Sequence, residues 1–181
     1  MEMEIIYSFE PVINQESRVL ILGSMPGVQS LREQKYYAHP YNHFWRIMYA
    51  LFDDSYGCSN AGVSRMEESS KLPDPDYENR KQFLLDRKIA LWDVIRSCSR
   101  EGSLDTNIVN EQTNDFKNLF IRYPHLELLA FNGAKGFNIY KRKIRLESAS
   151  IAYLQLPSTS PANTMKFEEK LTHWKAILKY L

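Results

Sequence analysis

Two asparagines, Asn42 and Asn132, stand in segments that could carry chemistry on a ligand. Asn42 ends a loop dense in aromatic and polar groups and precedes an apolar stripe that begins at Phe44. Asn132 ends an apolar run and is followed by Gly133. A carboxamide holds a donor and an acceptor at fixed separation, so either side chain could read a base edge or orient a water. Either could equally cap a helix or form an Asn turn, because both positions favour that use of asparagine.

A glycine-bounded loop and a hydroxyl-rich loop offer further binding groups. Residues 23–27 read Gly-Ser-Met-Pro-Gly, and the glycines let backbone N–H groups approach an anion or a base edge. Residues 156–164 read Leu-Pro-Ser-Thr-Ser-Pro-Ala-Asn-Thr, where rigid N–H and hydroxyl donors could hold phosphates without sequence preference. An ordinary strand-exit turn and a linker that caps the last helix are the alternatives.

Other side chains have both a functional and a structural interpretation. An aromatic on a loop, such as Tyr37, can stack on a nucleobase, whereas His39 can be a surface histidine. Asp93 lies near the end of an apolar run, where a carboxylate is costly unless partnered, and we expect it to orient a loop or a water. The segment from Lys135 to Arg145 holds five basic residues, which suit a solvated face or a phosphate backbone.

Four continuously apolar runs of strand length must position these segments. They are Arg18–Leu22, Ile89–Ile95, Leu126–Phe131 and Ile151–Leu156. Helical patterns lie between and after them, at residues 44–52, 76–87, 113–122, 133–144 and 167–181, and an irregular insertion is expected at 55–75. Continuous apolarity suits strands covered on both faces, so we predict a three-layer α/β/α sandwich with a central, mostly parallel four-stranded sheet. Ligands in such folds collect beyond the carboxyl ends of the strands.

Length and composition limit the number of domains and exclude several kinds of cysteine-based site. The 181 residues suit one domain over residues 1–181, and a net charge of +1 excludes a basic tail as the means of binding a polyanion. Two cysteines are too few for a disulfide framework, a four-cysteine zinc site or an iron–sulfur cluster. The acidic start and the absence of an apolar run of roughly 20 residues lead us to expect a soluble, cytoplasmic protein without a membrane partner.

Taken together, these segments resemble the uracil-DNA glycosylase superfamily, and most closely its hypoxanthine (deoxyinosine) DNA glycosylase branch. The residues that carry the likeness are Gly23–Gly27, Tyr36–Trp45, Leu91–Val94, Asn132–Lys135 and Leu156–Pro161, so it covers nearly the whole chain from Arg18. The resemblance implies a monomeric, monofunctional enzyme that flips a deaminated base out of DNA and hydrolyses its N-glycosidic bond. Flipping is needed because that bond cannot be reached inside a stacked duplex. Neither a cofactor nor a metal is expected, because this hydrolysis needs no Lewis acid.

The resemblance also assigns roles to individual residues. The expected catalytic residues are Asn42 and Asn132; the expected base pocket is Gly23, Ser24, Met25, Pro26, Gly27, Tyr37, His39 and Phe44; the expected DNA-binding residues are Lys135, Ser158, Thr159, Ser160 and Asn163. Our hypothesis is that Asn42 orients the water or stabilises the departing purine. Asn132 would read the lactam edge, a carbonyl acceptor beside an N–H donor.

Met25 bears on the choice of branch. The uracil-specific branches carry a water-positioning Asp or Asn at this place, whereas methionine cannot bond strongly to water. The hypoxanthine branch shares this feature and gives importance to the Asn of its His-Pro-x-Asn segment, here Asn42. The alternatives are the same fold acting on uracil or a mismatched pyrimidine, a non-catalytic nucleic-acid-binding module, and a small-molecule nucleoside hydrolase.

Overall fold

The computed structural model of this chain describes residues 4–53, 72–146 and 150–181. Its central sheet has four parallel strands in the order β3-β2-β6-β7. The strands are β2 (Val19–Gly23), β3 (Ile89–Asp93), β6 (Leu128–Asn132) and β7 (Ala152–Leu156). Gly23 lies opposite Asp93 and Asn132 lies opposite Leu156, so all four strands finish at one edge of the sheet.

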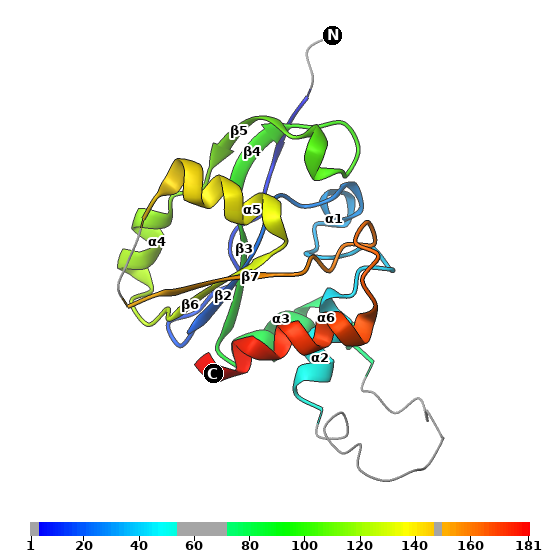
Figure 1. Cartoon of the computed structure of the whole chain (residues 1–181), viewed down its shortest axis with the longest axis vertical. Coiled ribbons are helices and arrows are strands. Elements are labelled where there is room, and N and C mark those ends of the chain that lie inside the picture. Colours follow the sequence, from blue (N-terminus) through cyan, green and yellow to red (C-terminus); the bar gives the residue numbers. More distant parts are fainter. Residues whose placement is uncertain (1–3, 54–71, 147–149) are drawn as a thin grey trace.

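Helices cover both faces of this sheet (Figure 1). On one face lie α2 (Phe44–Leu51), α3 (Tyr77–Leu85), α6 (Phe167–Trp174) and a 3-10 turn at Lys175–Tyr180. On the other lie α4 (Phe116–Arg122), α5 (Ala134–Ile139) and a π-helical turn at Tyr140–Ile144. Successive strand residues point to opposite faces, so Val19 and Ile21 pack in the first layer and Leu20 and Leu22 in the second. The predicted three-layer sandwich is confirmed.

A second, three-stranded antiparallel sheet was not predicted. Its order is β1-β4-β5, formed by β1 (Ile5–Tyr7), β4 (Ile95–Ser99) and β5 (Val109–Thr113). The predicted strand Ile89–Ile95 therefore ends at Asp93, and Ile95 begins a strand of the other sheet. The polar, largely exposed residues of β5 carry little of the apolar signal that marks a strand.

The expected helices are present with shifted ends. The helix expected at 113–122 starts at Phe116, because Thr113 pairs in β5 and the Asp115 side chain caps the helix by accepting from the Asn118 N–H. The short helix α1 (Val28–Glu33) was not predicted, since Ser30 is its only buried residue. Most of the insertion expected at 55–75 lies outside the described residues.

Trp174 joins the core to the loop after β7. Its side chain is fully buried, and its Nε1–H donates to the Pro157 carbonyl at 3.0 Å. We expect Trp174→Ala to lower the free energy of unfolding by about 3–5 kcal/mol, because it leaves a large cavity, and Trp174→Phe to cost less. Urea unfolding measures both values. A loss below about 1 kcal/mol for Trp174→Ala would contradict the packing described.

Candidate active site

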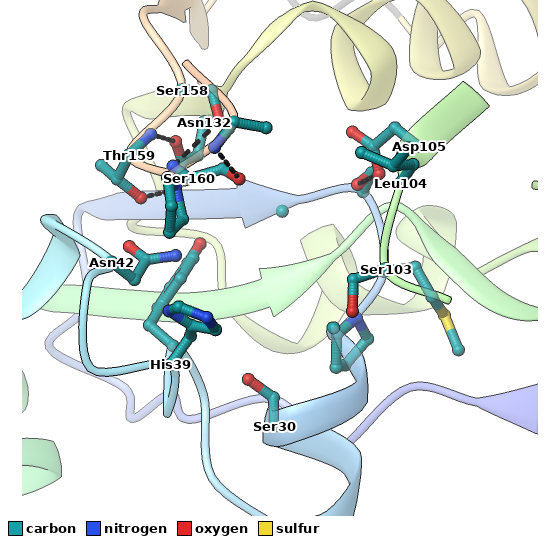
Figure 2. Close-up of a pocket in the computed structure, with 18 of the residues that line it drawn as sticks. Ser30, His39, Asn42, Ser103, Leu104, Asp105, Asn132, Ser158, Thr159 and Ser160 are labelled. Carbon is teal, nitrogen blue, oxygen red and sulfur yellow. Dashed lines mark hydrogen bonds between the residues drawn. The ribbon is translucent and has the colours of Figure 1, made fainter. Parts of the chain in front are cut away.

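A cavity of about 410 Å³ lies where the four parallel strands end. The loops that follow β2, β6 and β7 line it, together with the aromatic loop before α2 and residues 103–106. Figure 2 shows Asn132 and Ser158–Ser160 gathered on one side near Asn42 and His39, with Ser103, Leu104 and Asp105 across the opening. This is the ligand position typical of open α/β sheets, and the volume is typical of a small-molecule site.

The structure brings together most of the residues predicted for the site. Those that line the cavity are Gly23, Ser24, Met25, Pro26, Gly27, Tyr37, His39, Asn42, Asn132, Ser158, Thr159, Ser160 and Asn163. Phe44, predicted in the base pocket, lies behind it instead, because α2 buries this ring completely in the core. Lys135 stands on α5 outside the cavity lining.

The Asn42 amide contacts the backbone through its oxygen, and its nitrogen faces the cavity that the residue lines. Its Oδ1 accepts from the Phe44 N–H at 3.0 Å, an Asx-turn contact just before α2, whose N-cap residue is His43 rather than Asn42. Within the described part of the chain, no group accepts a hydrogen bond from its Nδ2. The Asx turn therefore fixes the amide orientation while two N–H donors stay available to a ligand or a water.

The Asn132 amide, in contrast, is engaged on both sides by Thr159. Its Oδ1 accepts from the Thr159 N–H at 2.8 Å, and its Nδ2 donates to Thr159 Oγ1 at 2.9 Å. The side chain also hydrogen-bonds to Tyr37. Reading a base edge would require some of these bonds to break, so the arrangement suits a residue that holds the Thr159 loop and Tyr37 in place.

Tyr37 has a backbone conformation that a tyrosine rarely adopts, with φ at 54°. Its ring stacks on Phe44 with centroids 3.8 Å apart and an interplanar angle of 19°. Burial, with the negative charge of Asp93 adding to it, raises the pKa of the Tyr37 hydroxyl, which stays protonated at neutral pH. The stack and the bond to Asn132 together hold a strained residue whose ring lines the cavity.

A buried ammonium group anchors the loop that follows β7. The Lys170 side chain on α6 is fully buried, and its Nζ donates to the Asn163 carbonyl at 2.9 Å and to the Ser160 carbonyl at 3.5 Å. The backbone N–H of His43 donates to the Thr159 carbonyl at 3.0 Å. These bonds connect the hydroxyl-rich loop to α6 and to the start of α2.

Several cavity residues were not among those predicted for the site. They are Gln29, Ser30, Tyr36, Asp93, Ser103, Leu104, Asp105, Thr106, Pro161 and Ala162. Residues 103–106 reach the cavity because the unpredicted β4–β5 excursion folds back over it, where Ser24 Oγ donates to Asp105 Oδ1 at 2.6 Å. Asp93 did give a signal, a carboxylate at the end of an apolar run, for which we expected a role in orienting a loop or a water.

Asp93 is the most perturbed acid of the site. It is 3% exposed, and burial raises the pKa of its carboxyl to about 8. The negative charge of Asp105 raises this pKa further, while Arg100 and the Tyr36 hydroxyl oppose the shift. The carboxyl is therefore largely uncharged at neutral pH.

Comparison with known proteins identifies the family. The model of the Uracil DNA glycosylase superfamily matches residues 10–181. The chain belongs to this superfamily. Superfamily members are N-glycosylases, so the protein is an enzyme, a DNA N-glycosylase of the hydrolase class, and it acts on DNA.

Individual relatives of this glycosylase span nearly its whole length. It is 33% identical over 172 residues to a protein of Methanosarcina acetivorans named hypoxanthine DNA glycosylase, an alignment that covers 95% of this chain and 97% of the relative. It is 34% identical over 171 residues to a protein of the same name from Methanosarcina barkeri, with 94% and 96% covered. A solution NMR structure of a candidate uracil DNA glycosylase from Methanosarcina acetivorans matches with a TM-score of 0.74, at 32% identity over 97% of this chain and 98% of that one.

The described residues also bear on metal binding and membrane insertion. Among residues 4–53, 72–146 and 150–181, no three His, Cys, Asp or Glu side chains gather as a possible metal site. Within those same ranges, none of the helices has the length and apolarity to cross a membrane.

The raised pKa of Asp93 predicts a pH-dependent stability of this glycosylase. Between about pH 4 and pH 8 the folded protein keeps a proton that the unfolded chain has lost, so the free energy of unfolding falls as pH rises. We expect a decline of about 1 kcal/mol per pH unit from this group, absent in Asp93→Asn. Urea unfolding at pH 5 and pH 7.5 measures it, with the exposed Asp86→Asn as the control. If the free energy of unfolding falls equally with pH in Asp93→Asn and in the wild type, the raised pKa is not that of Asp93.

The Lys170 anchor predicts local mobility on its removal. Lys170→Met keeps the length of the side chain but frees the Ser160 and Asn163 carbonyls, so hydrogen exchange of the loop amides at 158–165 should speed up by about tenfold. Lys166→Met, at an exposed position just before α6, is the matched control. Unchanged exchange in Lys170→Met would show that the loop is held without the ammonium group.

Proposed function

We propose that this glycosylase removes hypoxanthine from deoxyinosine in DNA by base flipping and hydrolysis of the N-glycosidic bond, leaving an abasic site. The observation that carries the proposal is the combination of two cavity residues: Met25 stands where uracil-specific branches place a polar residue, and the Asn42 Nδ2 has no acceptor among the residues that the structure describes. The Methanosarcina relatives named hypoxanthine DNA glycosylase support the same substrate.

Asn42 is the residue that we propose acts on the reaction itself. Its bond to the Phe44 N–H fixes the amide, so its Nδ2 can orient the attacking water or donate to the departing purine. Loss of the base leaves an oxocarbenium-like sugar, which oriented dipoles and DNA phosphates can stabilise, so no strong general base is needed. The enzyme is then monofunctional, because water is the nucleophile.

Asn132 and Tyr37 would prepare the pocket for the flipped base. The Tyr37 ring lines the cavity and can contact the base by stacking, as aromatic residues do for unstacked bases. Asn132 holds both Tyr37 and Thr159, which makes it a positioning residue in this proposal rather than the reader of the lactam edge.

The loop 158–163 would hold the DNA backbone. Ser158 Oγ accepts from the Ser160 N–H, and Ser160 Oγ accepts from the Ala162 N–H, both at 3.2 Å. Because these oxygens accept from within the loop, their O–H groups are left to donate outward, to phosphate oxygens for example. The buried Lys170 charge beneath the loop favours an anion there.

Deoxyuridine is the second candidate substrate. Uracil presents the same lactam edge as hypoxanthine, and the matching solution structure is described as a candidate uracil DNA glycosylase. We propose that the enzyme acts as a monomer, as the family resemblance implies. The free, buried Cys98 fits the reducing cytoplasm that we propose as its location.

Single-turnover cleavage of matched duplexes with one deoxyinosine, one deoxyuridine or no lesion tests the substrate, with alkali revealing abasic sites. We expect cleavage at deoxyinosine to be at least about tenfold faster than at deoxyuridine, and none without a lesion. Faster cleavage at deoxyuridine would overturn the hypoxanthine proposal. Binding without cleavage of any lesion would favour a non-catalytic module.

The asparagine variants test the mechanism on the same duplexes. We expect Asn42→Ala to lower the rate at deoxyinosine by roughly 10²–10³-fold, because it removes a donor that acts in the transition state, and Asn132→Ala to lower it less. Asn118→Ala, on the exposed surface of α4, should match the wild type. Near-normal rates in both Asn42→Ala and Asn132→Ala would refute the mechanism.

A further inference from the structure

The Asp93 carboxyl is a buried polar group of the cavity with unused hydrogen-bonding capacity. Asp93 ends β3, lines the cavity and is 3% exposed. Its Oδ2 is buried and has no hydrogen-bond partner among the described residues. Buried polar atoms are usually satisfied, so an unpaired oxygen at a ligand cavity indicates a contact that the ligand completes.

Gly23 provides the space for this carboxyl. In the parallel register Gly23 lies directly opposite Asp93, and a Cβ at Gly23 would stand only 2.4 Å from Asp93 Oδ1. Any side chain at this position would displace the carboxyl from the cavity wall. Gly23 therefore leaves space for the Asp93 carboxyl in addition to allowing the turn.

No cation neutralises the carboxyl. Among the residues that the structure describes, no ion pair includes Asp93. The titratable groups that act on it or respond to its charge are Asp105, Arg100, Tyr36, Tyr37 and Tyr77. Arg100 donates instead to the Pro26 carbonyl, and its Nε and Nη1 are themselves unpaired. A carboxyl in such surroundings takes up a proton, which agrees with its pKa of about 8.

A neutral carboxyl matches the edge of a deaminated base. Its O–H is a donor and its carbonyl is an acceptor, side by side, and a lactam edge presents a carbonyl acceptor beside a ring N–H. Because the Asn132 amide is already engaged by Thr159, Asp93 is the better placed of the two to meet this edge.

We propose that Asp93, in its uncharged form, binds the lactam edge of the flipped base, donating to the base carbonyl oxygen and accepting from the ring N–H. This inference rests on the proposed glycosylase function. As the glycosidic bond breaks, negative charge builds up on the base and its carbonyl oxygen becomes a stronger acceptor. The contact is then stronger in the transition state than in the ground state, as rate acceleration requires.

Ionisation of Asp93 abolishes this contact. A carboxylate has no donor, and its charge faces the lone pairs of the base carbonyl. The neutral form is lost as pH rises through the pKa of about 8, so cleavage should slow at alkaline pH in step with this ionisation.

The test is single-turnover cleavage of deoxyinosine and deoxyuridine duplexes from pH 6 to pH 9.5. We expect the wild-type rate to fall by about tenfold per pH unit above pH 8. Asp93→Asn keeps a neutral donor and acceptor, so it should stay within about tenfold of wild type at pH 7 and lack the alkaline decline. Asp93→Ala should be roughly 100-fold or more slower than the wild type at pH 7, and this deficit should shrink at alkaline pH as the wild-type carboxyl ionises. Asp86→Asn should keep the wild-type profile, and thermal unfolding confirms that each variant is folded.

The outcomes separate this inference from the proposed function. If the wild type cleaves a lesion and a folded Asp93→Ala variant matches its rate at pH 7, the role of Asp93 is overturned. The glycosylase assignment then stays intact. Persistence of the same alkaline decline in Asp93→Asn also overturns it. A wild type inactive on both lesions overturns both proposals.

Discussion

The common edge at which the four parallel strands end is the constraint on which the site depends. Parallel in-register pairing places Gly23 beside Asp93 and brings Asn132 next to the loop after Leu156. Residues at or just after the end of each strand therefore line the cavity. The two helical layers pack on the sheet and hold the strands in that register. At the same edge lies the buried Asp93 carboxyl, whose Oδ2 has no partner among the described residues, and such surroundings favour its uncharged form.

The sheet and its helical layers could be predicted because their signal is local. Continuously apolar runs show strands buried on both faces, and the stripe from Phe44 shows a helix with one buried side. The second sheet could not be predicted in this way. The exposed residues of β5 carry no periodic apolar pattern, and the turn at Asp93 that sends Ile95 into that sheet lies within one continuous apolar run.

The loops that form the candidate site could be predicted, but the roles of the individual residues within it could not. The sequence places Asn42 before the apolar stripe that begins at Phe44 and Asn132 at the end of an apolar run. It does not show that Thr159 engages the Asn132 amide while the Asn42 Nδ2 has no acceptor among the described residues. Such pairing depends on contacts between residues far apart in the chain. For Asp93 we expected a role in orienting a loop or a water, because the sequence does not show that, among the described residues, no ion pair includes this carboxyl.

The position of the base would be seen in a crystal structure of the enzyme with a duplex that carries an uncleavable 2′-fluorinated deoxyinosine. We expect hypoxanthine flipped into the cavity, with its carbonyl oxygen and ring N–H about 3 Å from the two Asp93 oxygens and the Asn42 amide nitrogen facing the sugar or a water near it. A base that stays stacked in the duplex, or one that enters the cavity with its lactam edge turned away from Asp93, would contradict it.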